Sequence, residues 1–181
     1  MSNTSAHSSQ PSSPSHGRWP GAGRIVAFFC VIALVAYALD ATIDAGLRRI
    51  RTSGFGNSNG IIGGTINAEI VISGSSRAMV HYDPKIIREI TGRSTYNLGV
   101  NGSQTDMQLA VLKVYLKHNA KPALIIHNLD MYSFETSREI FNPAQYVPYL
   151  DEDILYTAVR RVYPDAWKWK YIPLYGYVVE D

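Results

Sequence analysis

The sequence predicts an α/β domain built on a parallel sheet, preceded by one helix that can cross a membrane. Three short segments at 68–73, 94–98 and 123–129 have the character of strands, and the first and third are nearly all apolar. Segments with helical periodicity and helix-starting residues lie between them. An unbroken apolar run from Ile25 to Leu39 indicates the membrane helix.

The composition is that of one domain with appendages. The chain has 181 residues, of which 46% are hydrophobic, and a formal net charge of only +2. Domains typically contain ~100–200 residues, so one folded unit is expected. Because the charge is small and the Lys and Arg residues are scattered, we expect no nucleic-acid partner. The single cysteine, Cys30, is in the apolar run and gives no information about the redox compartment.

The N-terminal region is predicted to contain a tail and a membrane anchor. Residues 1–23 are rich in Ser, Pro and Gly, and we expect them to be disordered because they bury too little apolar surface. The apolar run reaches nineteen residues when it is extended to Ile43, close to the ~20 that cross a bilayer. We therefore expect residues 25–43 to contact membrane lipid within a signal anchor at 24–47.

A cleaved signal peptide is the alternative interpretation of the same run. Ala36-Tyr37-Ala38 fits a small-x-small cleavage site after an apolar region of suitable length. The helical pattern continues past this site to Ile50, which favours the retained anchor. Both interpretations export the rest of the chain, and we expect a single-pass membrane protein with its C-terminal domain outside the cytoplasm. Arg residues flank both ends of the run, so the positive-inside rule does not decide its orientation.

Residues 48–65 are predicted to be a flexible juxtamembrane linker. The stretch 54–64 is rich in Gly and Asn, which is typical of flexible linkers. It follows no predicted strand and precedes no predicted helix, which argues against a dinucleotide-binding loop. The folded domain is then expected to occupy residues 66–181.

The first half of this domain carries clear element boundaries. Segment 68–73 is apolar and β-branched, as in a buried strand. Asp83 and Pro84 predict a helix start, with Asp as the N-cap and Pro at the first helical position, and Gly92 marks its end.

The second half continues the alternation of strands and helices. After the strand at 94–98, Ser103 or Thr105 is expected to cap a longer helix that ends at 119–122. A third, nearly all-apolar strand follows at 123–129. The β-α-β-α-β order predicts a parallel sheet with right-handed crossovers and helices on both faces.

Polar loops follow the three predicted strands at 74–77, 97–102 and 127–130. The loops after parallel strands lie along one edge of the sheet, which is where α/β proteins bind ligands. We therefore expect the functional site at this edge.

The three loops resemble the sequence blocks of the SGNH (GDSL-like) hydrolases. In that family a Gly-x-Ser nucleophile follows the first strand, and a Gly and an Asn after the next two strands help form the oxyanion hole. The Gly74–Ser76 segment is similar to the first block, Gly99 to the second and Asn128 to the third. The resemblance covers about residues 66–150 and implies part of a flavodoxin-like three-layer sandwich.

The resemblance implies acyl transfer without a metal or another cofactor. Ser76 Oγ would attack the carbonyl of an ester-bearing envelope glycan or small molecule. The backbone N–H groups of Ser76 and Gly99 and the amide of Asn128 would hold the oxyanion. Arg77 and Asn101 are the expected substrate-binding residues.

The sequence departs from the family in its catalytic base. It contains no Asp-x-x-His block, and the simplest interpretation is that the chain stops before it. His81 and His127 are the candidates for a substitute base, whereas His118 is expected to be solvated on a helix surface. Leu129 stands where many family members have Asp, although Asp130 follows.

Two further hypotheses compete with the enzyme. One is a catalytically inactive module with the same partial fold. The other is an interaction protein whose partner chain covers the aromatic tail that begins at Phe141, in which a helix is expected over 151–162. Purely structural roles are also open: a turn for 74–76, turn geometry for Asn97 and Asn101, and an ion pair between Arg77 and Asp83 or Glu89.

Overall fold

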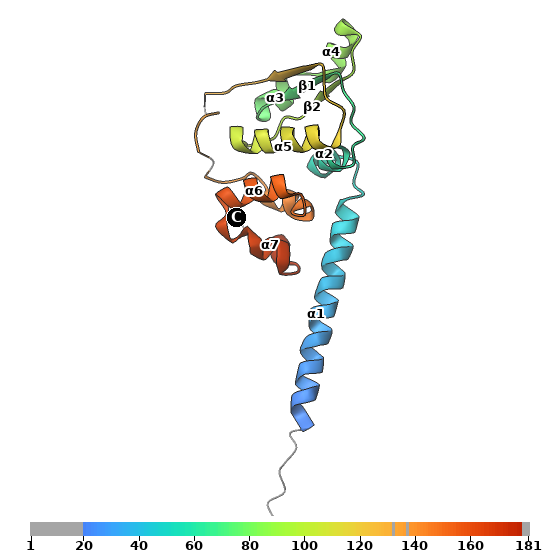
Figure 1. Cartoon of the computed structure of the whole chain (residues 1–181), viewed down its shortest axis with the longest axis vertical. Helices are drawn as coiled ribbons and strands as arrows, with labels where there is room; N and C mark the ends of the chain where they lie inside the picture. Colours follow the sequence, from blue (N-terminus) through green and yellow to red (C-terminus); the bar gives the residue numbers. More distant parts are fainter. Residues whose placement is uncertain (1–19, 132, 137, 179–181) are drawn as a thin grey trace, which may run out of the picture. The chain divides into compact units, whose positions relative to one another are not determined.

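A computed structural model describes residues 20–131, 133–136 and 138–178 of the chain. Its architecture is mixed α/β, with a three-stranded parallel sheet and an apolar N-terminal helix (Figure 1). Contacts divide the chain into two units with the boundary after Val35, and the sheet belongs to the second unit.

The first helix, α1, spans Pro20–Leu47 and is long and apolar enough to cross a membrane. Its 28 residues correspond to a length of ~42 Å, against ~30 Å for the hydrocarbon core of a bilayer. Residues 20–23 were expected in the disordered tail but are helical, because Pro is tolerated in the first turn of a helix. The rest of the expected tail, residues 1–19, lies outside the described residues.

The segment expected to be a flexible linker is largely helical, which corrects the sequence prediction. Helix α2 spans Ser53–Ile62 and buries Ile61. The amide of Asn59 donates hydrogen bonds to the carbonyls of Leu47 and Ile50 at 2.9 and 2.8 Å. Such tertiary contacts outweigh the low helix propensity of the Gly and Asn residues.

The three predicted strands form one parallel sheet in the order β2-β1-β3. In the register of this sheet, Ile72 is opposite Asn97 on one side and Ile126 on the other. The strands are β1 (Ile70–Ser73), β2 (Thr95–Asn97) and β3 (Leu124–His127).

Two helices, α3 (Ser76–His81) and α4 (Pro84–Thr91), connect β1 to β2. The start and end of α4 are as predicted from the sequence. Asp83 accepts a hydrogen bond from the Lys85 N–H at 2.8 Å, and Gly92 ends the helix in the left-handed conformation with φ 70°.

Helix α5 spans Thr105–His118, but its capping differs from the prediction. The N-cap residue is Gln104, whose own side chain makes no capping hydrogen bond. The hydroxyls of Ser103 and Thr105 instead donate to the carbonyls of Val100 and Ser133. These bonds hold the loop before α5 and the loop after β3.

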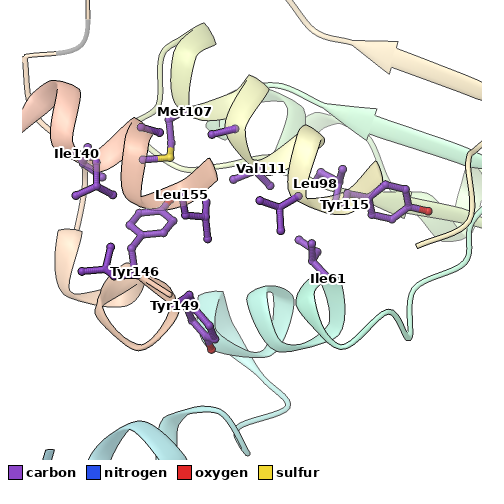
Figure 2. Close-up of a cluster of buried hydrophobic side chains, with 14 of the residues drawn as sticks. Ile61, Leu98, Met107, Val111, Tyr115, Ile140, Tyr146, Tyr149 and Leu155 are labelled. Carbon is purple, nitrogen blue, oxygen red and sulfur yellow. The ribbon is translucent and has the colours of Figure 1, made fainter. Parts of the chain in front are cut away.

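The main core is on the α5 side of the sheet. Helix α5 lies between the sheet and α6 (Asp153–Val162), which was expected from the sequence (Figure 1). Figure 2 shows side chains from several elements converging there. The core includes Ile61, Val71, Leu98, Met107, Val111, Tyr115, Tyr149 and Leu155.

The C-terminal region is a series of short helices. It comprises η1 (Pro143–Tyr149), η2 (Pro164–Ala166), α7 (Trp167–Tyr171) and α8 (Tyr175–Val178). Several of its aromatic side chains are covered by the chain itself, since Tyr146 and Tyr149 are buried in the core.

His118 is not fully solvated as expected but is half-buried in an ionic cluster around the buried Glu152. Its Nε2 lies 2.7 Å from Oε2 of Glu152, and Lys117 Nζ lies 2.7 Å from Oε1. Burial alone would raise the pKa of the Glu152 carboxyl, but its hydrogen bonds to Lys117 and His118 outweigh burial and lower this pKa below its usual value. The cluster connects the end of α5 to the start of α6.

The third strand is the main departure from the predicted sandwich. It was expected to be buried, yet Leu124 and Ile125 are 49% and 39% exposed. On one side β3 pairs with β1, and no fourth strand follows it in the part of the chain that the structure describes. An apolar edge strand with this exposure lacks the cover that a complete sandwich would give it.

Candidate functional site

The loops that follow β1 and β3 meet at the carboxyl ends of these strands. The Asn128 N–H donates to the Ser73 carbonyl at 2.8 Å. Gly74 has φ 152°, and a Cβ atom there would lie 2.8 Å from Ala78 Cβ and 3.0 Å from Asn128 Cβ. Only glycine fits this position without a shift, and its absence of a side chain allows α3 to start beside Asn128.

Asp130 links the two loops through Ser75. The Ser75 hydroxyl donates a short hydrogen bond to Asp130 Oδ2 and accepts one from the Arg77 N–H at 3.2 Å, which caps α3. The second carboxylate oxygen, Oδ1, accepts from the Asn128 amide at 3.0 Å and lies 3.7 Å from Arg77 Nε. Within the described residues, Arg77 therefore pairs with Asp130 rather than with Asp83 or Glu89.

Ser76 is the first residue of α3 and lines a cavity of about 450 Å³. Its hydroxyl makes no hydrogen bond to another residue in the described ranges. Two guanidinium groups and three carboxylates share this cavity, which makes it strongly polar. The lining residues are Ser75, Ser76, Arg77, Gly102, Ser103, Gln104, Asp130, Ser133, Glu135, Thr136, Arg138 and Glu139.

Gly99 and Asn101 line a different cavity, also of about 450 Å³, next to α2. The Gly99 N–H donates to Asn97 Oδ1 at 2.8 Å, so the proposed oxyanion donor already has a partner. A Cβ atom on Gly99 would lie 2.5 Å from the Met79 nitrogen. The structure thus assigns Gly99 a clear packing role, namely the close approach of α3 to the end of β2.

Asn97 is a structural residue of this edge, as one of the alternative interpretations held. Its amide donates to the carbonyls of Ala78 and Tyr82 at 2.8 and 2.9 Å. These bonds tie the end of α3 to β2 and fix the direction in which α3 leaves the sheet.

Asn128 does not line the Ser76 cavity, but it contacts a residue that does. Its Oδ1 accepts from the Tyr82 hydroxyl at 3.2 Å, and its Nδ2 donates to Asp130. An amide nitrogen carries two donors, and within the described ranges the second amide hydrogen of Asn128 makes no hydrogen bond.

Neither of the two candidate substitute bases lines the cavity. His81 ends α3 and His127 ends β3, and both are exposed. The proton acceptors that do line the cavity are the carboxylates of Asp130, Glu135 and Glu139. Among the residues that the structure describes, no group of three or more His, Cys, Asp or Glu could hold a metal ion.

The Ser75–Asp130 pair is the main feature of the site that sequence reasoning missed. The two residues are 55 positions apart, and only the parallel pairing of β1 with β3 brings them together. The available signal was an acidic residue shortly after the third predicted strand. Comparisons with family models, curated proteins and solved structures find no match for this chain.

Proposed function

We propose that this chain is a membrane-anchored SGNH-like module that transfers or hydrolyses the acyl group of an ester-bearing substrate through Ser76. The observation that supports the proposal is the position of the Ser76 hydroxyl. It lies on a cavity of about 450 Å³ beyond the carboxyl end of β1, the edge at which parallel α/β sheets bind ligands.

The strand order gives the proposal its fold context. The order β2-β1-β3 is the beginning of the flavodoxin-like order 2-1-3-4-5, in which the ligand lies at the β1/β3 switch point. Ser76 follows β1 and Asp130 follows β3, so both residues border that point. In a complete sandwich of this type a further strand would pair with the exposed β3.

The reaction follows from the groups around the cavity. Ser76 Oγ attacks the ester carbonyl, its proton passes to a cavity carboxylate, and the C–O bond breaks as the alcohol leaves. Water or an acceptor hydroxyl then takes the acyl group from Ser76. The Ser76 N–H is the first donor proposed for the oxyanion, and the Asn128 amide would join it only after its side chain turns toward the cavity, which it does not line. Gly99 would join them only after its bond to Asn97 breaks.

Substrate selection is proposed to depend on positive charge. The side chains of Arg77 and Arg138 line the cavity, and guanidinium groups bind carboxylates and phosphates through paired hydrogen bonds. An anionic ester, such as an acylated acidic envelope glycan, fits this chemistry. The proposed location of the domain is outside the cytoplasm, with α1 as the single membrane span.

A non-catalytic binding module is the second candidate. It is favoured by the exposed positions of His81 and His127, neither of which lines the cavity.

The test is hydrolysis of p-nitrophenyl acetate by the full chain in detergent, compared with its Ser76→Ala and Ser75→Ala variants. The enzyme proposal predicts turnover that is lost in Ser76→Ala. The Ser75→Ala variant should retain part of it, because Ser75 is bound to Asp130 rather than free. No turnover in the folded parent chain would favour the binding module.

A further inference from the structure

The C-terminal aromatic segment, defined as residues 164–178, is hydrogen-bonded to the second half of α1. The Leu174 N–H donates to Asp40 Oδ1 at 2.8 Å, and the Tyr177 hydroxyl donates to Asp44 Oδ1. All of these residues lie in the second structural unit, as does Tyr37. The Tyr37 hydroxyl donates to the Tyr171 carbonyl at 3.3 Å. The segment is therefore fixed along about two turns of α1.

This segment has one buried side and one exposed apolar side. Trp169 packs on Tyr163, with ring centroids 5.0 Å apart, and belongs to the partly buried shell of the core. Trp167, Tyr171 and Ile172 are 44%, 59% and 40% exposed. Lysines alternate with these rings at 168 and 170. Tryptophan, tyrosine and lysine are the residues that concentrate at membrane–water interfaces.

The position of the contact along α1 fixes the depth of the segment. The apolar run of α1 extends to Ile43, and Tyr37 precedes Ile43 by six residues. At 1.5 Å per residue, Tyr37 lies ~9 Å on the membrane side of Ile43. Interfacial helices bury their apolar face ~5–10 Å into the boundary between headgroups and acyl chains. A segment that contacts both Tyr37 and Asp44 therefore covers the depth of this boundary.

We propose that residues 164–178 insert into the bilayer interface beside α1, with the lipid bilayer itself as the partner of the exposed aromatic side chains. The inference rests on the proposed membrane anchor and adds a second point of attachment for the domain. Two attachments restrict rotation of the domain about α1, so the cavity would keep a fixed height and orientation above the lipid surface. A partner chain over the aromatic tail is then not needed.

The same contacts account for the two acidic residues of α1. A carboxylate at or below the interface is costly unless it has hydrogen-bond partners. Asp40 accepts from the Leu174 backbone and Asp44 from the Tyr177 hydroxyl. Both acidic side chains thus receive donors from the inserted segment instead of relying on water.

The experiment measures tryptophan quenching in the full chain, reconstituted in phosphatidylcholine vesicles that carry a nitroxide label either near the headgroup or deep in the acyl chains. Trp19→Phe serves as the background. Adding Trp167→Phe leaves Trp169 as the only tryptophan, so the difference between the two proteins reports Trp167 without altering the packed Trp169. We expect the headgroup-level label to quench Trp167 roughly twofold more strongly than the deep label does.

A control separates this inference from the anchor. The control adds Ile32→Trp to the protein that already carries Trp19→Phe and Trp167→Phe. Its new tryptophan lies inside the apolar run of α1, and the signal of Trp169 is the same in both proteins. If the deep label quenches this tryptophan while neither label quenches Trp167, the membrane anchor is supported and the proposed insertion of residues 164–178 is wrong. If neither label quenches the tryptophan at 32, the anchor itself fails, and the inserted segment fails with it.

Discussion

Strands β1 and β3 are paired neighbours with similar sequences, IVIS and LIIH, yet their surroundings differ completely. Every residue of β1 is buried, whereas three of the four residues of β3 are exposed. Val71 and Ile125 are opposite each other in the register, and only Val71 belongs to the core. Position in the sheet, rather than apolar character, therefore decides burial: β1 has a strand on each side, and β3 is an edge.

The difference bears on the candidate site because each strand contributes one part of it. The end of β1 leads into Gly74, Ser75 and Ser76, which are held against a fully packed strand. The end of β3 leads into Asn128 and Asp130, which follow an exposed strand. The nucleophile candidate is thus built on the more firmly packed half, and its acidic neighbour on the less covered half.

The largest expected effect on the free energy of unfolding comes from shortening one isoleucine to alanine in each of the two strands. Ile72→Ala removes a side chain with no exposed surface and should destabilise the fold by about 2–5 kcal/mol. Ile125→Ala removes a partly solvated side chain and should cost less than about 1 kcal/mol. Denaturant unfolding of the two variants measures the difference. Equal losses would mean that β3 is as well covered as β1 in solution.

Substitution in the turn between β1 and the site should lower the free energy of unfolding nearly as much. Gly74→Ala should cost about 2–4 kcal/mol, of which backbone strain and overpacking against Ala78 and Asn128 each contribute about 1–2 kcal/mol. Gly92→Ala is the matched control, since Gly92 also has positive φ but has open space around it, and should cost about 1 kcal/mol. A small effect at Gly74 would show that the turn relaxes easily.

The ionic cluster of Lys117, His118 and Glu152, between α5 and α6, should make stability depend on pH. The folded-state pKa of Glu152 is lowered, so its contribution is complete above the unfolded value of about 4.3 and is lost as pH falls through the folded pKa. Glu152→Gln should cost about 1–3 kcal/mol at neutral pH and flatten this dependence. Glu135→Gln, at an exposed glutamate, should change neither quantity, and unfolding curves at several pH values compare the two variants.

The smallest effect on folding is expected at the open edge. Ile125→Lys should change the unfolding free energy by less than about 0.5 kcal/mol, because the side chain is already in contact with water. It should reduce concentration-dependent association, since an edge lysine opposes strand pairing. Light scattering over a range of concentrations measures this association. If the association is unchanged, it does not involve the edge of β3.

Local signals in the sequence were sufficient for much of the fold. The three strands, the Asp83 cap, the stop at Gly92 and the helix that became α6 all depend on short-range patterns, and the structure confirms them. Helix α2 could not be predicted in this way. Its Gly- and Asn-rich sequence becomes helical because of distant partners, such as the Tyr149 hydroxyl, which lies 2.6 Å from Asn59 Oδ1.

The candidate site was predictable in its place but not in its contacts. The order of elements puts Ser76 and Asn128 at one edge of the sheet, and the structure agrees. The pairs Ser75–Asp130 and His118–Glu152 join residues 55 and 34 positions apart, so neither follows from spacing. The exposure of β3 was missed because an apolar run has the same composition whether another element covers it or not.

The central claim is that Ser76 is an accessible nucleophile at the end of the packed strand. The most direct measurement is incubation of the full chain with a fluorophosphonate, followed by peptide mass spectrometry of the region 74–85. Our account predicts covalent modification of Ser76 that is lost in Ser76→Ala and persists in Ser75→Ala. An unmodified Ser76 in the folded chain, or equal modification of Ser75, would contradict it.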